Sequence, residues 1–128
     1  MELVCTPVNV ADLSTIAGAY PLRPTPPAVP GIEGLFKVKE VGASVSALSP
    51  GDLVIPHKPT FGLNSCCRWR LTREGTWTTA AVAPAETLTK VSPKLQPEYA
   101  ASMAISPSTA LRLVEDFVDL QEGIRKNA

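Results

Sequence analysis

The chain has 128 residues, of which 45% are hydrophobic, and its 12 Lys and Arg balance its 12 Asp and Glu. Neither the net charge of zero nor any long run of like charges suggests binding to nucleic acid or to an anionic membrane, and no apolar run reaches the roughly 20 residues of a membrane span. The length predicts one domain.

The first part of the chain predicts a strand, a short helix and a stiff arm. Residues 2–8 contain enough apolar and β-branched side chains to predict a strand, which is expected to end at Pro7. Asp12 is expected to cap a short helix through Ile16, with Gly18 as its left-handed stop. Prolines fix φ between residues 21 and 30, which favours an extended arm directly after Tyr20.

The middle of the chain predicts more short strands. Over residues 34–42, Phe36 and Val38 alternate with lysines, as in a strand with one solvent-facing side. Pro and Gly at the centre of residues 49–52 indicate a turn into a buried strand over 53–56. Residues 76–82 and 87–91 look like two further strands. These elements describe a small, twisted, mostly antiparallel barrel or sandwich.

Two helices are expected to close the domain. Residues 97–104 form the first, and Ser106 and Pro107 provide an N-cap and a first-turn proline for the second. The second helix has an apolar stripe made by Ala110, Val114 and Phe117. Residues 118–128 show no pattern that would form a core.

The cysteines and the one histidine do not indicate a metal site. The cysteines are Cys5, Cys66 and Cys67, an odd number with two adjacent, which fits neither a disulfide framework nor a Cys-x2-4-Cys metal motif. We interpret them as reduced thiols, and His57 as a surface residue at a strand end.

Several motifs follow one another in an order typical of a known family. The segments "PVNVADL", "GAYPLRPTPPAVPGIEG", "SPGDLVIP", "GTWTTAAV" and "ISPSTALRLVEDF" resemble the catalytic domain of the medium-chain dehydrogenase/reductase superfamily. Within it, the chain is most similar to the mitochondrial trans-2-enoyl-CoA reductases. The resemblance implies a GroES-like fold over residues 1–117, mainly β with short helices (α+β) in a partly open barrel. Residues 63–74 interrupt it as an insertion loop.

The resemblance also implies an activity. Family members reduce trans-2-enoyl thioesters of coenzyme A or acyl carrier protein with NADPH, in mitochondrial fatty acid synthesis, as homodimers. They continue into a nucleotide-binding Rossmann domain, which would begin at residues 118–128. No G-x-G-x-x-G motif follows Phe117, so we expect most of the NADPH site to be missing and this chain to be a truncated, inactive form. We also expect no transit peptide within it.

The resemblance makes Tyr20 the catalytic residue, because the family's Gly-x-Tyr-Pro motif falls on residues 18–21. Hydride added to the β-carbon of an enoyl thioester leaves an enolate that needs a hydrogen-bond donor and then a proton. A phenol, with an ordinary pKa of about 10, can supply both. The prolines after Tyr20 would hold the arm in place before substrate binds.

Further positions align with family motifs, some with the family's residue and some with another. Ile32 and Glu33 stand where zinc-dependent members have a His-Glu pair. Because Ile cannot bind metal, no zinc is expected. Glu33 is assigned a structural role as an acceptor for backbone amides. Trp77 lies where the family has a cleft-lining tryptophan, although an ordinary sheet aromatic is equally compatible. Ser106 replaces an asparagine that contacts the cofactor, a role that its N-cap position competes with. Thr109 matches the motif's threonine.

Two alternatives remain open at this stage. The chain could be a non-catalytic GroES-like module that pairs with a longer partner, or part of another zinc-free reductase, such as a quinone reductase. Three arginines in the insertion could suggest binding of coenzyme A phosphates, but a solvated loop explains them more simply; they are Arg68, Arg70 and Arg73.

Overall fold

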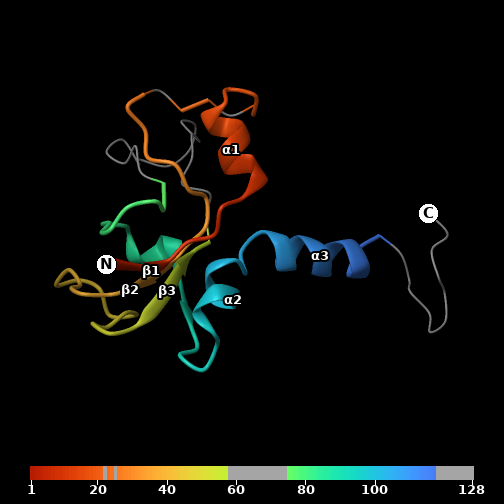
Figure 1. Cartoon of the computed structure of the whole chain (residues 1–128). Helices are drawn as coiled ribbons and strands as arrows, with labels where there is room; N and C mark the ends of the chain where they lie inside the picture. The colour runs from red at the N-terminus through yellow and green to blue at the C-terminus, as the bar shows by residue number, and fades with distance from the viewer. Residues whose placement is uncertain (22, 25, 58–74, 118–128) are drawn as a thin grey trace.

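The computed structural model describes residues 1–21, 23, 24, 26–57 and 75–117 (Figure 1). Four strands form one antiparallel sheet in the order β1 (Glu2–Cys5), β2 (Leu35–Lys37), β3 (Leu53–Pro56) and β4 (Leu88–Val91). Three helices accompany it, α1 (Val10–Ile16), α2 (Pro97–Ala101) and α3 (Ser106–Glu115), with a short 3-10 helix, η1 (Ala85–Thr87). No pairing joins β1 to β4 within the described residues. The expected α+β fold with a partly open barrel is therefore confirmed.

Both faces of the sheet bury apolar side chains. Alternate residues point to opposite faces of a strand, so Leu35 and Phe36 enter different clusters. Leu35 packs with Ile55, Val91 and the two alanines of α2, whereas Phe36 packs with Val38, Leu48 and Val54. The expected alternation of buried and exposed residues in β2 is confirmed at Phe36, Lys37 and Val38. Lys37 and Lys39 are exposed, as expected of the solvent-facing side, but Leu35 on the same side is buried against the alanines of α2.

Two turns form as the sequence predicts. Gly51 has φ +96 in the turn before β3, and Ser49 N–H donates to Asp52 Oδ2 at 3.0 Å. Gly18 has φ +71 directly after α1, so it is the predicted left-handed stop. The amides of Ala19 and Tyr20 both donate to the carbonyl of Ser14. The end of α1 therefore fixes the backbone at Tyr20.

Residues 76–82 do not form the predicted strand. They make only an isolated bridge between Glu2 and Ala80, together with backbone hydrogen bonds from Leu3 N–H to Thr79 O and from Ala81 N–H to Met1 O. The physical reason is that Thr76 and Trp77 are already paired with the loop at Pro30 and Gly31, which turns the segment out of the strand direction.

Two predicted helix caps are also wrong. The N-cap of α1 is Asn9, and Asp12 is the third helical residue, whose carboxylate accepts the Asn9 N–H at 2.9 Å. The N-cap of α3 is Ile105, and Ser106 is the first helical residue. The backbone N–H of Ile105 donates to the carboxylate of Glu33, a residue far away in the sequence.

Helix α3 does not close the domain. It projects away from the sheet (Figure 1), and none of its residues is buried. It ends at Glu115, so Phe117 lies beyond it and is 74% exposed. The apolar stripe that the sequence predicts is present but does not face this domain's core.

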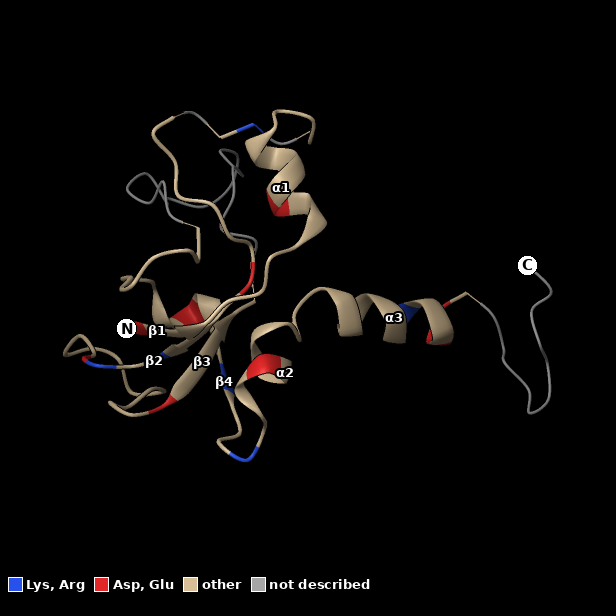
Figure 2. Ribbon diagram, viewed as in Figure 1, with Lys and Arg blue, Asp and Glu red and all other residues tan. Residues whose placement is uncertain are grey.

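In the described part of the chain, Lys and Arg (blue) and Asp and Glu (red) are scattered over separate loops and helices (Figure 2). No stripe of Lys and Arg is visible in this view, as the balanced composition predicts. No helix in the described part of the chain is long and apolar enough to cross a membrane.

The ion pair between Lys90 and Asp52 predicts a small dependence of stability on pH. Lys90 Nζ lies 2.7 Å from Asp52 Oδ1. The hydrogen bonds that Asp52 accepts from Lys90 and from Ser49 N–H lower the pKa of its carboxyl group. A depressed folded-state pKa stabilises the protein above the unfolded pKa of about 4, and this stabilisation is lost as the pH falls through the folded value. Thermal melts between about pH 6 and pH 3 should therefore show a smaller acid-induced loss of stability for Lys90→Met than for wild type.

Lys94→Met is the control, because Lys94 has no ion pair among the described residues. Equal acid sensitivity of wild type and Lys90→Met would contradict this assignment.

Candidate functional site

A buried carboxylate lies where the segments that carry the predicted site residues meet. Glu33 is 1% exposed, directly before β2. Its Oε2 accepts Asn9 Nδ2–H at 3.0 Å, and its Oε1 accepts the Ile105 N–H at 2.7 Å. One side chain thus joins the N-cap of α1 to the N-cap of α3. The expected role of Glu33 as an acceptor for backbone amides is confirmed, although the amide lies 72 residues away rather than in the local turn.

Two threonines complete this arrangement. The hydroxyls of Thr6 and Thr76 both donate to the backbone carbonyl of Glu33, at 2.6 and 2.5 Å, and lie 3.2 Å from each other. Thr76 is 2% exposed. We call Thr6, Asn9, Glu33, Thr76 and Ile105 the Glu33 network. Because its members come from four segments that are separate in sequence, the network fixes the relative positions of those segments.

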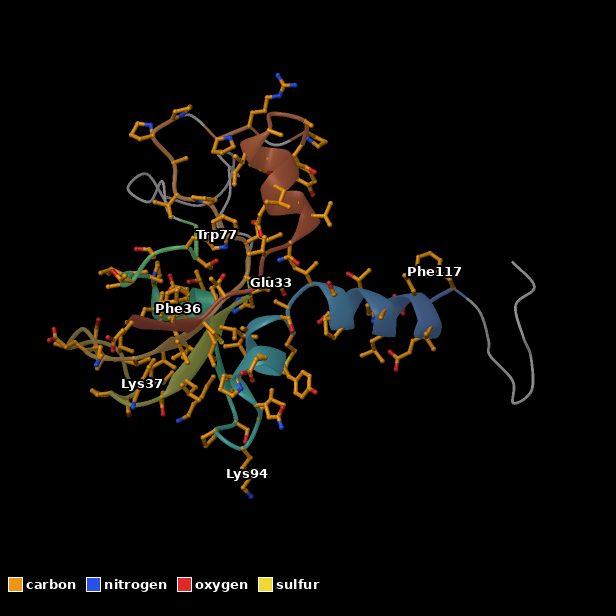
Figure 3. The ribbon with its side chains drawn as sticks, viewed as in Figure 1. Glu33, Phe36, Lys37, Trp77, Lys94 and Phe117 are labelled. Carbon is orange, nitrogen blue, oxygen red and sulfur yellow. The ribbon has the colours of Figure 1, made fainter. Side chains whose placement is uncertain are left out.

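Trp77 is half-buried beside this network. Figure 3 shows its side chain near Glu33, at the base of α1. Its indole N–H donates to Pro7 O at 3.3 Å, and its backbone N–H donates to Pro30 O at 2.9 Å. The indole N–H is therefore engaged with the protein itself, and only the ring is available to a ligand. The cleft-lining role of Trp77 stays a prediction.

Tyr20 lies just after α1 and begins the proline-rich arm. Its side chain is 41% exposed, and its hydroxyl has no hydrogen-bond partner among the described residues. Its backbone is fixed by the Ser14 carbonyl, as described above. A partly exposed phenol on a fixed backbone suits a hydrogen-bond donor to a bound molecule. The catalytic role stays a prediction.

Ser106 follows Ile105 at the start of α3 and is exposed. Its hydroxyl makes no hydrogen bond within the described part of the chain, and Thr109 is also exposed. Loss of the N-cap role removes the structural explanation that competed with cofactor contact. That contact remains a prediction.

Sequence reasoning missed Asn9, Thr6 and Thr76. The Asn9 to Asp12 spacing is that of a capping box, and this signal could have identified the true start of α1. No comparable local signal marks the two threonines, since their partner is distant in sequence.

The remaining candidates give little chemistry. In residues 1–57 and 75–117, apart from the two undescribed positions, no group of three His, Cys, Asp or Glu could hold a metal ion. The absence of zinc therefore stays a prediction that rests on Ile32. Cys5 is a free thiol whose pKa is raised by burial and by Glu98. The other cysteines, the three arginines and the insertion at 63–74 lie outside the described residues.

Comparison with known families matches residues 1–93 to the alcohol dehydrogenase GroES-like domain. The chain is 39% identical over 123 residues to the mitochondrial enoyl-[acyl-carrier-protein] reductase of Arabidopsis thaliana, and 40% identical to that of Mus musculus. Each alignment covers 96% of this chain, and 29% and 30% of the two relatives. The chain thus spans about a third of the length of these relatives.

Solved structures give the same result. An enoyl thioester reductase from Candida tropicalis superposes with a TM-score of 0.76 at 29% identity, and an Etr1p complex with NADP and crotonyl-CoA with a TM-score of 0.75 at 30% identity. Each covers 94% of this chain and 35% of the solved chain. The resemblance to mitochondrial enoyl reductases is confirmed, and the chain belongs to the family of alcohol dehydrogenase GroES-like domains.

Proposed function

We propose that this chain is the catalytic-domain part of an NADPH-dependent enoyl thioester reductase, and that Tyr20 is its hydrogen-bond and proton donor. The observation that carries the proposal is the position of Tyr20: a phenol with a fixed backbone and a free hydroxyl, in a chain similar to reductases of this type. The substrate is a trans-2-enoyl thioester of coenzyme A or acyl carrier protein, and the product is the acyl thioester.

The chemistry follows from the charge that the reduction creates. NADPH, when bound, supplies the hydride that is added to the β-carbon of the substrate. Tyr20 O–H donates a hydrogen bond to the thioester oxygen, where negative charge develops. It then transfers its proton to the α-carbon and is reprotonated from solvent. Donors placed in advance at a developing oxyanion give a large part of the rate enhancement in many enzymes.

The described residues are compatible with a nucleotide at the start of α3. Ser106 presents a free hydroxyl there, next to an amide whose position is set by Glu33. We propose Ser106 as a cofactor contact and Trp77 as a wall of the substrate site. Because most of the NADPH site would lie outside this chain, we also propose that the 128 residues alone do not turn over substrate.

The setting of the parent protein is proposed from its relatives. The curated relatives are named as mitochondrial, and one solved neighbour is named as an Etr1p/Etr2p heterodimer from Candida tropicalis. We therefore propose a mitochondrial protein that acts as a dimer, a homodimer being the simplest form.

The proposal is tested with a chimera in which this chain replaces the matching part of the Candida tropicalis reductase. We expect the chimera to oxidise NADPH only when crotonyl-CoA is present and to form butyryl-CoA, and we expect the chain alone to do neither. NADPH absorbance and mass spectrometry of the thioester are the measurements.

The outcomes separate the alternatives. A folded chimera that binds NADPH but does not reduce crotonyl-CoA would contradict the proposal, and reduction of a quinone instead would indicate a different reductase. Turnover by the 128-residue chain alone would contradict the proposed inactivity. The NADPH-binding measurement excludes misfolding as the reason for a negative result.

A further inference from the structure

The two helices nearest to the candidate site are only weakly packed against the sheet. In α1, the one buried residue is Asp12, and the apolar side chains of Val10, Leu13 and Ile16 are at least 55% exposed. In α3, no residue is buried, and Figure 3 shows Phe117 far from the sheet. Apolar burial in this domain therefore does not fix the direction of either helix.

The carboxylate of Glu33 contacts both helices at their N-caps. Among the described residues, the bond from Ile105 N–H to Glu33 Oε1 is the only side-chain hydrogen bond that ties the start of α3 to the sheet. The other oxygen, Oε2, accepts a hydrogen bond from the side chain of Asn9, the residue at which α1 begins. Helix α1 in turn leads to Tyr20. Glu33 itself lies in the loop before β2 and is held there by the two threonines and by burial.

We infer that Glu33 is a positioning residue that sets the start of α3, with Ser106, relative to helix α1, which leads to Tyr20. The catalytic importance of this positioning rests on the proposed function, whereas the positioning itself is inferred from the hydrogen bonds alone. A carboxylate is required because both partners donate: Asn9 through its amide and Ile105 through its backbone. Negative charge at a helix N-terminus is also favourable to the helix dipole.

The variant Glu33→Gln tests this requirement. A glutamine replaces one of the two carboxylate oxygens with an NH2 group, which donates only, so it cannot accept at both of the positions where Asn9 and Ile105 now donate. If its oxygen stays on Ile105, its NH2 faces the NH2 of Asn9, unless Asn9 turns over and disrupts the capping box of α1. Either arrangement leaves one contact of the network unmade.

The double variant Asn9→Asp with Glu33→Gln should restore the network. The carboxylate introduced at position 9 would accept from the side-chain NH2 introduced at position 33, and the amide oxygen at position 33 would accept from Ile105 N–H. Aspartate is as good an N-cap as asparagine, so α1 keeps its start, and the number of acidic side chains in the network is unchanged. Glu40→Gln is the charge control, because Glu40 is exposed and has no hydrogen bond or ion pair among the described residues.

The measurement is NMR of the 128-residue chain, which does not require catalysis. In Glu33→Gln, we expect hydrogen exchange of the Ile105 amide to accelerate about tenfold or more and order parameters over residues 106–115 to fall. Exchange at Leu35 and Val54 in the sheet should stay unchanged. The double variant should return both quantities to within about a factor of three of wild type.

Each other outcome overturns the inference. If Glu33→Gln leaves Ile105 exchange and the order of α3 unchanged, Glu33 does not position the helix. If the double variant fails to restore them, or if Glu33→Gln fails to fold and the double variant does not rescue folding, the residue has only a general structural role. Because no activity is measured, failure here is distinguishable from failure of the reductase proposal, which the chimera tests.

Discussion

Replacing Tyr20 with Phe should lower crotonyl-CoA reduction by the chimera on the order of a hundredfold or more, as the loss of a single oxyanion donor does in other enzymes. The change removes only the hydroxyl, which has no hydrogen-bond partner among the described residues, and the ring is 41% exposed. The free energy of unfolding should therefore stay unchanged. Steady-state rates at saturating NADPH and crotonyl-CoA, with a thermal melt of each protein, are the measurements.

The chain contains its own control for this experiment, because its two tyrosines are Tyr20 and Tyr99. Tyr99 is 64% exposed on α2 and matches no motif of the reductase family. Tyr99→Phe should keep the rate of wild type. A rate for Tyr20→Phe within about a factor of three of wild type would remove the donor role, since an interaction made only in the transition state lowers kcat when it is lost.

Replacing Gly31 with Ala should strongly destabilise the fold. Gly31 has φ +100, and a Cβ there would overlap Thr76 Oγ1 and Trp77 Cδ1 and lie 2.8 Å from the backbone nitrogen of Trp77. Strain at a left-handed position and overpacking each cost about 1–3 kcal/mol, so the free energy of unfolding should fall by roughly 2–6 kcal/mol. Denaturant unfolding of the 128-residue chain, followed by tryptophan fluorescence, is the measurement.

Gly51→Ala separates the two causes. Gly51 has a similar φ of +96, but a Cβ there would meet no atom within 4 Å. Its loss should be limited to the backbone cost of about 1–2 kcal/mol. Equal losses for the two variants would show that the contact of Gly31 with Thr76 and Trp77 is not tight, and would weaken the placement of Trp77 beside the Glu33 network.

Features specified by neighbouring residues could be predicted from the sequence. The turn at 49–52, the stop at Gly18 and the alternation around Phe36 depend on φ preferences and on a period of two, which are visible in a few consecutive residues. The candidate residue Tyr20 came from a motif rather than from periodicity, and its free hydroxyl is compatible with the role that the motif implies.

Features that depend on distant partners could not be predicted. The Glu33 carboxylate pairs with the amide of Ile105, 72 residues away, and no local pattern indicates this pairing. Likewise, residues 76–82 have strand-like composition, but the pairing of Thr76 and Trp77 with Gly31 and Pro30 prevents a regular strand. The sequence pattern of α3 shows an apolar stripe but not which surface it faces.

The most direct test of the central claim is a crystal structure of the chimera with NADP and crotonyl-CoA. We predict that the Tyr20 hydroxyl oxygen lies within about 2.6–3.2 Å of the thioester oxygen or in reach of the α-carbon. A structure in which the ring of Tyr20 points away from the thioester and is enclosed by packed side chains would contradict it.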